Sequence, residues 1–442
     1  MARSAAAAPG LAAFDFILLA VFFIGIYLEV AIHISPSIPL PSAPSGLAGL
    51  VLLWRRRDQM QPMHLAGLFG IILLYVGAVL SAPDYTYLPK RFTGLVQLVY
   101  SLVIGYAMLL TVLLATRRQL ARFFLGFSLF IVIGCLLETY AGLDRLSDQV
   151  RLAIYDSGIY DADLRDRLLY GKVRPKLFTS EPSAVTFSYT LFTLSWFIVS
   201  TSRWKLPLFA VLLASGLLAM PGPTLLLSLP VLVAYYLFVD AGRGSATRRI
   251  AVIMLSAILL VVFVTIGLTV YSERLSFILA GNDPSFFYRV IGPALVARHV
   301  IEQYPWAGAG LTGADFIADL VLNVYVQSAN FSAGWKITRI ADVLTNFFWL
   351  HWIYLGLVWG SVIFVALSVW LRQLGAPSLA FCWIAWAVFG QASGAYVGPK
   401  TWAVLLLSAG LTILARRQPV APAAPARRAY WRPLPGVRHA AA

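Results

Sequence analysis

Long runs of uncharged apolar residues recur along almost the whole chain, and no other feature limits the fold as strongly. Hydrophobic residues make up 60% and charged residues 12% of the 442 residues. A single helix needs about 18–25 such residues to cross the hydrocarbon core of a bilayer. Because a soluble protein would not carry repeated runs of this kind, the sequence predicts an all-α, polytopic membrane protein.

We expect about twelve transmembrane helices, which follow these runs and end where proline, glycine or charge interrupts them. The predicted ranges are 14–34, 38–54, 64–82, 92–115, 123–142, 183–202, 204–220, 222–239, 249–271, 345–371, 378–397 and 401–415. They divide the chain into helices one to five (1–142), a first loop (143–182), helices six to nine (183–271), a second loop (272–344), helices ten to twelve (345–415) and a tail (416–442).

Positive charge falls on every second short connection between the predicted spans, with Lys90, Arg91 and Lys400 as the exceptions. The clusters are Arg55 to Arg57, Arg117 and Arg118 with Arg122, Arg203 with Lys205, Arg243 with Arg248 and Arg249, and Arg372. Connections rich in arginine and lysine remain in the cytoplasm, so both termini are expected to be cytoplasmic and both long loops periplasmic.

The net charge of +15 needs no nucleic-acid partner under this topology, because basic connections face anionic membrane lipid. The tail 416–442 is rich in alanine, proline and arginine, and we expect it to be disordered in the cytoplasm.

A few ionisable residues interrupt the predicted spans, at an insertion cost of about 2.5–3.5 kcal/mol each. Glu29, His33, Glu138 and His351 all fall in the outer half of a span, whereas Asp15 stands alone near an inner boundary. These groups either lie at the headgroup level or line a polar cavity roofed by the two loops. The deep inner half lacks a charged path, which argues against an ion or proton pump.

The first loop ends in a polar segment, Arg174 to Ser183, that runs directly into the sixth predicted span. Pro182 suits the first turn of a helix, and Glu181 beside it is either a structural cap or a general base presented at the cavity mouth. Arg174 and Lys176 would supply positive charge nearby. Asp161 and Asp163 form a D-x-D pair, which we interpret as a chance occurrence in an acidic loop rather than a metal site.

The second loop carries Tyr288 and Arg289, followed by Arg298 and His299, on a stretch 289–303 that reads as a helix along the membrane surface. Arginine suits phosphate because its planar fork donates two hydrogen bonds and stays charged. Nine residues separate the two arginines, so they do not share one helix face. The aromatic side chains either stack on sugar rings or belong to an interfacial belt.

Three blocks of the sequence resemble the bacterial O-antigen ligase/polymerase superfamily of membrane glycosyltransferases. They are the R-P-x-L-F-x-x-E-P-S run at Arg174–Ser183, Arg289 followed by Pro305-x-x-Gly308-x-Gly310, and Asn346 followed by Leu355-Gly356 and Gly360. The match covers roughly residues 170–415. Thr345 stands where ligases of this family typically carry histidine, which favours a polymerase; His351 lies six residues further on.

The resemblance implies a GT-C-like fold and a polysaccharide polymerase at the periplasmic face of the bacterial inner membrane. The donor would be an undecaprenyl-diphosphate-linked glycan, and the acceptor a sugar hydroxyl of another lipid-linked repeat unit. We expect no metal and no soluble cofactor. Catalysis would fall to Arg289, Glu181 and His351, and substrate binding to Arg174, Lys176, Tyr288, Arg298, His299 and Asn346. A chain-length regulator and a repeat-unit flippase are the candidate protein partners.

Three alternatives stay open at this point. An O-antigen ligase would use the same donor but transfer the glycan to lipid A core. A polysaccharide or lipid transporter would need polar groups through the full depth of the bundle. A lipid-sugar mannosyltransferase of related architecture would usually carry acidic residues in its first outer loop, and residues 35–38 carry none.

Overall fold

The computed structural model describes residues 10–35, 38–156, 159–161, 163–240, 283–327, 340 and 343–417, with isolated positions between 247 and 276. The predicted ninth span, 249–271, and the tail from 418 onward therefore lie outside the continuously described residues. The statements below apply to the described part of the chain.

Helices make up 78% of the structure and strands are nearly absent from the described residues, which confirms the all-α class. The longer helices are α1 (Ala13–Leu28), α2 (Ala43–Arg55), α3 (Pro62–Leu80), α4 (Leu88–Leu114), α5 (Arg117–Tyr140), α8 (Pro182–Val199), α9 (Lys205–Ala219), α16 (Phe347–Gln373), α17 (Leu379–Gly390) and α18 (Pro399–Arg416). The shorter helices are α6 (Asp144–Ile154), α7 (Asp163–Tyr170), α10 (Ser228–Tyr235), α13 (Pro284–Phe286), α14 (Gly292–Gln303) and α15 (Ala318–Val326).

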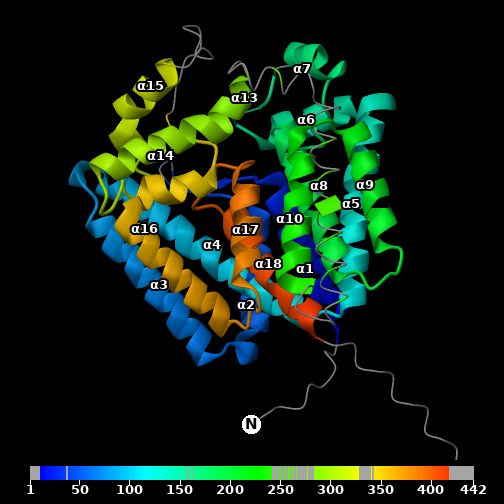
Figure 1. Cartoon of the computed structure of the whole chain (residues 1–442), viewed down its shortest axis with the longest axis horizontal. Helices are drawn as coiled ribbons and strands as arrows, with labels where there is room; N and C mark the ends of the chain where they lie inside the picture. Colours follow the sequence, from blue (N-terminus) through cyan, green and yellow to red (C-terminus); the bar gives the residue numbers. More distant parts are fainter. Residues whose placement is uncertain are drawn as a thin grey trace, which may run out of the picture.

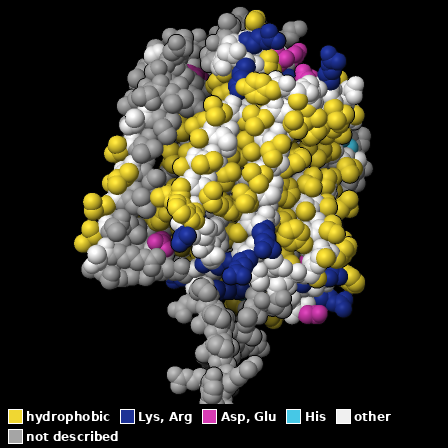
Figure 2. All heavy atoms as spheres, turned by 90° about the vertical axis from the view of Figure 1, so that its right-hand side faces the viewer, with side chains coloured by type: hydrophobic (Ala, Val, Ile, Leu, Met, Phe, Trp, Pro, Cys, Tyr) yellow, Lys and Arg dark blue, Asp and Glu magenta, His cyan; other side chains and the backbone are white. Residues whose placement is uncertain are grey.

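Six helical stretches in the described part of the chain are long and apolar enough to cross a membrane. They are Pro62–Leu80, Tyr85–Leu114, Arg117–Tyr140, Pro182–Val199, Pro223–Asp240 and Phe347–Gln373. Figure 2 looks onto the side where Figure 1 places α5 and α9, and shows hydrophobic side chains between two charged ends. The membrane-spanning character is thus supported, whereas the count of twelve spans stays a prediction.

The prediction that the first span reaches residue 34 and the second begins at 38 is wrong. Helix α1 ends at Leu28, and Glu29 follows in the left-handed region with φ 54°. The chain then forms an antiparallel hairpin of β1 (Ile32–Ser35) and β2 (Ile38–Leu40) before α2 begins. Proline at positions 39 and 41 lacks the backbone N–H that a helix interior requires, which explains the late start of α2.

The short helices of both long loops lie at one end of the bundle, the upper end in Figure 1. There α14 runs across the bundle, whereas α8, α10 and α17 run along it.

At the opposite end of the bundle lies Asp15 of α1. The sequence predicts that this residue stands alone, but Arg55 and Arg56 both form ion pairs of 2.6 Å with its carboxylate.

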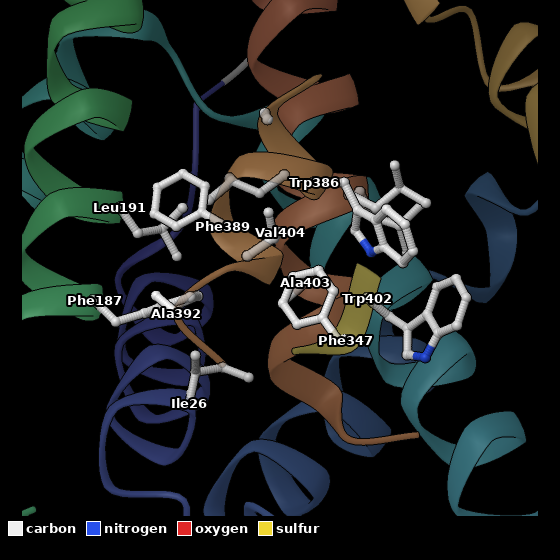
Figure 3. Close-up of a cluster of buried hydrophobic side chains, with 14 of the residues drawn as sticks. Ile26, Phe187, Leu191, Phe347, Trp386, Phe389, Ala392, Trp402, Ala403 and Val404 are labelled. Atoms are coloured by element: carbon white, nitrogen blue, oxygen red, sulfur yellow. The ribbon is translucent and has the colours of Figure 1, made fainter. Parts of the chain in front are cut away.

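Buried hydrophobic side chains from α1, α8, α16, α17 and α18 meet in one cluster (Figure 3). The ring of Phe187 on α8 lies 5.1 Å from that of Phe389, and the ring of Phe347 lies 5.2 Å from that of Trp386. Every residue of α8 is buried. A helix that is buried on all sides lies in the core of its bundle, so the start of α8, next to Glu181, is held by packing from every direction.

Helix α16 is broken at Gly356, and the second loop fills the break. Gly356 has φ 65° and ψ −170°, so neighbouring backbone groups lose their partners within the helix. The carbonyl of Pro305 accepts from the N–H groups of Leu357 and Val358, at 2.8 and 3.0 Å, and Ala309 donates to Ile353 at 2.8 Å. We call residues 304–309 the splice segment.

Lys90 and Arg91, which departed from the charge alternation, hold the second loop onto α4. Arg91 is fully buried and donates to the carbonyls of Asp84 and Ala309, each at 2.9 Å. Lys90 forms an ion pair with Asp315. Both side chains are therefore engaged by contacts within the protein.

We expect Gly308→Ala to destabilise the protein more than Gly375→Ala. Both glycines have positive φ, of 57° and 90°, which costs about 1–2 kcal/mol for any other residue. A Cβ on Gly308 would also lie 2.3 Å from the carbonyl oxygen of Ile353, whereas nothing lies within 4 Å of one on Gly375. Thermal unfolding of the purified variants in detergent measures the difference; equal losses in Tm would contradict the role of the splice segment.

Candidate functional site

The segment that leads into α8 has an unusual backbone. Leu177 and Phe178 are consecutive non-glycine residues with φ of 33° and 66°. Positive φ is rare for large side chains and persists only where the surrounding structure enforces it. Because such backbone concentrates at functional positions, this turn (residues 176–180, the 176–180 turn) is the first candidate for a site.

Buried polar side chains from other elements hold the 176–180 turn. The carboxylate of Glu138, at the end of α5, accepts from the backbone N–H groups of Lys176 and Leu177 at 3.0 and 2.6 Å. Tyr27 of α1 donates to the carbonyl of Leu177 at 2.7 Å. Three further side chains form hydrogen bonds with the turn. Ser147 accepts from the N–H of Phe178, Tyr155 donates to the carbonyl of Phe178, and Arg151 donates to the carbonyls of Thr179 and Ser180.

The turn delivers Glu181 to the position just before α8. Its backbone is extended, with φ −148°, and its side chain accepts no hydrogen bond from a backbone N–H group of the first turn of α8. The structural-cap interpretation is therefore not supported. Instead the hydroxyl of Ser183 donates to the Glu181 carboxylate. The half-buried Glu181 thus presents a carboxylate that no arginine or lysine neutralises among the described residues.

The two cations of the same motif have acidic partners in α7. Arg174 contacts Asp166 at 2.9 Å and stacks over Tyr170, with 4.9 Å to the ring centroid. Burial by itself lowers the pKa of Arg174, but Tyr170, Asp166 and Tyr160 outweigh it and raise that pKa overall. Lys176 contacts Asp163 at 3.0 Å. Both cations were predicted to bind substrate, but each is neutralised by a carboxylate of the protein. Asp163, the second aspartate of the D-x-D pair, is the partner of Lys176.

Arg289 lies in a π-helical turn, Phe287–Ile291, between α13 and α14. Such turns are rare and recur at functional positions. Two residues before α16 fix its backbone: Thr345 donates to the carbonyl of Tyr288 at 3.2 Å, and Asn346 donates to the carbonyl of Arg289 at 2.7 Å. The half-buried Arg289 side chain forms no ion pair or hydrogen bond among the described residues, so its charge remains available to an anion.

Asn346 itself has no capacity left for a substrate. It is fully buried, its oxygen caps α16 by accepting from Phe348 and Trp349, and its amide also donates to Gln391 at 2.8 Å. Its expected substrate-binding role is replaced by a positioning role. Tyr288 is likewise buried, with its ring 4.9 Å from that of Tyr325.

Arg298 and His299 lie away from this arrangement, on the exposed face of α14. The Arg298 side chain is 74% exposed and pairs with Glu302 at 2.9 Å, and His299 lies 3.6 Å from the same carboxylate. The hydrogen bond from Arg298 is the main reason why the pKa of Glu302 lies below its usual value. The end of α14 at Gln303 agrees with the predicted surface helix.

His351 is buried with both ring nitrogens engaged. One nitrogen lies 2.9 Å from the hydroxyl of Tyr396, and the other 3.0 Å from the carbonyl of Gly360 beyond the break in α16. A base needs an open path to the proton it removes, and His351 has none in this arrangement. Glu29 and Glu138 also have internal partners, Lys400 and the 176–180 turn.

No hydrogen bond or ion pair joins Arg289 to Glu181 among the described residues, and their convergence stays a prediction. A short path of contacts connects them. Glu181 lies six residues, about 9 Å of helix, before Phe187. The ring of Phe187 packs on that of Phe389, two residues before Gln391, and Gln391 bonds to the asparagine that holds Arg289.

An apolar cavity of about 570 Å³ adjoins the 176–180 turn. Its walls come from α1, α5 and the first loop, and Arg122 is the one charged residue among those that line it. Phe178 of the turn, Tyr27 and Leu28 line the part of the cavity next to the 176–180 turn. Pockets of about 300–1,000 Å³ suit small ligands, and this lining suits a hydrocarbon chain.

Comparison with protein-family models and with curated proteins found no match to this chain.

Sequence reasoning missed most residues that build the site. Arg151, Ser147 and Tyr155 lie in the first loop without a recognisable motif, and Glu138 was left between a headgroup position and a cavity lining. The one available signal was the cost of burying Glu138, which requires compensating donors. The sequence could not show that these donors are backbone N–H groups.

We expect Glu138→Gln to loosen the 176–180 turn. The amide cannot accept well from both N–H groups, and a buried donor without a partner costs about 1–3 kcal/mol. Amide hydrogen exchange at Lys176 and Leu177 should accelerate about tenfold or more. The matched change Glu302→Gln, on the exposed face of α14, should leave that exchange unaltered, and unchanged exchange in Glu138→Gln would refute the assignment.

Proposed function

We propose that this protein is a membrane glycosyltransferase that polymerises a lipid-linked polysaccharide. It would transfer a glycan from undecaprenyl diphosphate to the sugar hydroxyl of another lipid-linked unit, at the periplasmic face of the bacterial inner membrane. The proposal includes twelve spans in a GT-C-like arrangement with both termini in the cytoplasm. It draws on the resemblance of the three sequence blocks and on the contacts that these blocks make.

One observation carries the proposal: two of the three blocks each hold one unneutralised side chain on a backbone that hydrogen bonds fix in place. The 176–180 turn is fixed from four directions and ends at Glu181. Thr345 and Asn346 fix the π-helical turn at Arg289. Rigid support of a free acid and a free cation is the arrangement that preorganised electrostatic catalysis requires.

The chemistry follows from these two groups. Transfer breaks the bond between the anomeric carbon and the diphosphate oxygen, and forms a bond from that carbon to the acceptor oxygen. Arg289 would bind the diphosphate and stabilise the negative charge that builds on the leaving oxygen. Glu181 would orient the acceptor hydroxyl and take its proton. The two internal contacts of His351 argue against it as the base.

The apolar cavity beside the 176–180 turn gives the hydrocarbon part of a lipid-linked substrate a place to lie. The part of the cavity next to this turn is lined by Phe178, three residues before Glu181. A polyprenyl chain in this cavity would bring its head group to the level of the turn. The glycan would then extend into the space beside the short helices of the two loops (Figure 1).

Arg289→Ala should abolish long-chain polysaccharide while the protein remains in the membrane. Loss of a preorganised charge that stabilises the leaving group lowers turnover by about 10²–10³-fold. Gel analysis of the polymer made by complemented cells gives chain length, and immunoblotting of membranes gives the protein amount.

Arg298→Ala is the matched control, because this arginine lies nine residues away and is exposed and paired. It should leave chain length nearly normal. Near-normal chains in Arg289→Ala, or an equal loss in both variants, would contradict the assignment of Arg289.

Glu181→Gln should lower polymerisation by about 10²–10⁴-fold, the usual contribution of a general base. The amide keeps the size of the side chain and an acceptor for Ser183, so the fold should persist. Transfer between purified lipid-linked units measures the rate, with lipid A core as a second acceptor to separate polymerase from ligase.

His351→Gln serves as the comparison for the base. It should lower Tm, because Tyr396 and Gly360 lose a partner, but it should retain more activity per folded molecule than Glu181→Gln. The opposite order would assign the base to His351.

A further inference from the structure

A second cavity lies at the end of the bundle opposite α13 and α14. It has a volume of about 430 Å³ and is formed where α16 ends, α17 begins and α18 ends. Three arginines line it, together with the connecting turn; the lining is Arg372, Gly375, Ala376, Pro377, Ile413, Arg416 and Arg417. We call it the arginine pocket. It contains no carboxylate among its lining residues.

The positive charge of the arginine pocket exceeds what its surroundings neutralise. Helices α16 and α18 end here, and each carboxyl end contributes roughly −0.5 of an elementary charge, whereas the start of α17 contributes roughly +0.5. Helix dipoles therefore offset well under one of three positive charges. Arg417 donates to the carbonyl of Leu113 at 2.5 Å. Arg372 and Arg416 are exposed, and their guanidinium groups make no hydrogen bond or ion pair among the described residues.

The chain that follows the pocket offers no internal counter-ion. Residues 418–442 contain no aspartate or glutamate and add four arginines. The chain after the pocket therefore supplies positive charge and no carboxylate side chain.

An apolar stripe leads along α16 to the same pocket. Val362, Val365 and Val369 are exposed and precede Arg372 by ten, seven and three residues, so all four lie on one helix face. A hydrocarbon chain would lie along the valines while a charged head group reached the arginines. A free phosphate would leave this stripe unused.

We propose that the arginine pocket binds the phosphodiester head group of an anionic membrane lipid. Arg372 and Arg416 bind the phosphate, and Arg417 closes the pocket through its contact with α4. Arginine is suited to this task because its guanidinium stays charged and donates paired hydrogen bonds to phosphate oxygens. The site is independent of Arg289 and Glu181 and does not rest on the proposed glycosyl transfer.

The test uses the full-length protein in detergent micelles and titrates phosphatidylglycerol, with bound lipid counted by native mass spectrometry. The variant is Arg372→Gln with Arg416→Gln. Its matched control is Arg118→Gln with Arg203→Gln, which removes two exposed arginines from other connections that the sequence places on the same side. Tm in phosphatidylcholine micelles establishes that each variant is folded.

We expect the pocket variant to bind phosphatidylglycerol about thirtyfold more weakly than the unaltered protein, and the control to bind it equally well. Phosphatidylcholine should bind poorly, and millimolar inorganic phosphate should not displace the anionic lipid. Equal binding by a folded pocket variant overturns the proposal, as does equal binding of phosphatidylcholine. Displacement of the lipid by inorganic phosphate would instead make the pocket a site for a soluble anion.

Discussion

The hydrogen bonds between the splice segment and the break in α16 are the contact on which the end of the bundle that carries α14 depends. An interrupted helix inside an apolar bundle cannot leave its N–H and C=O groups without partners. Pro305 and Ala309 supply those partners, and Gly308 makes the close approach possible. Because α14 precedes the splice segment directly, this contact also fixes the helix that begins just after Arg289.

Buried polar side chains in this protein act mainly on the backbone. Glu138 binds two N–H groups of the 176–180 turn, and Asn346 binds two N–H groups of α16 and the carbonyl of Arg289. Each is costly to bury and each is fully compensated. The most buried polar groups thus set the backbone geometry, whereas the half-buried Arg289 and Glu181 have no partner of opposite charge among the described residues.

Each end of the bundle combines paired cations with a few that have no partner. At the end that carries α13 and α14, Lys90, Arg91, Arg174, Lys176 and Lys400 are bound to carboxylates or carbonyls of the protein, whereas the Arg289 side chain has no such partner among the described residues. At the opposite end, Arg55 and Arg56 pair with Asp15, whereas the guanidinium groups of Arg372 and Arg416 have no partner among the described residues. Both proposals rest on the unpartnered cations.

The sequence by itself determined the all-α class, the approximate positions of most long helices and the end of α14, because these follow from hydrophobic runs and from proline and glycine. It also placed Arg289 and Glu181 in motifs. Only the tertiary structure decided which polar side chains have partners within the protein. Asn346, His351 and Asp15 bond to residues 40 or more positions away in the sequence. Such pairing depends on how helices distant in sequence pack together, and no local pattern of residues encodes it.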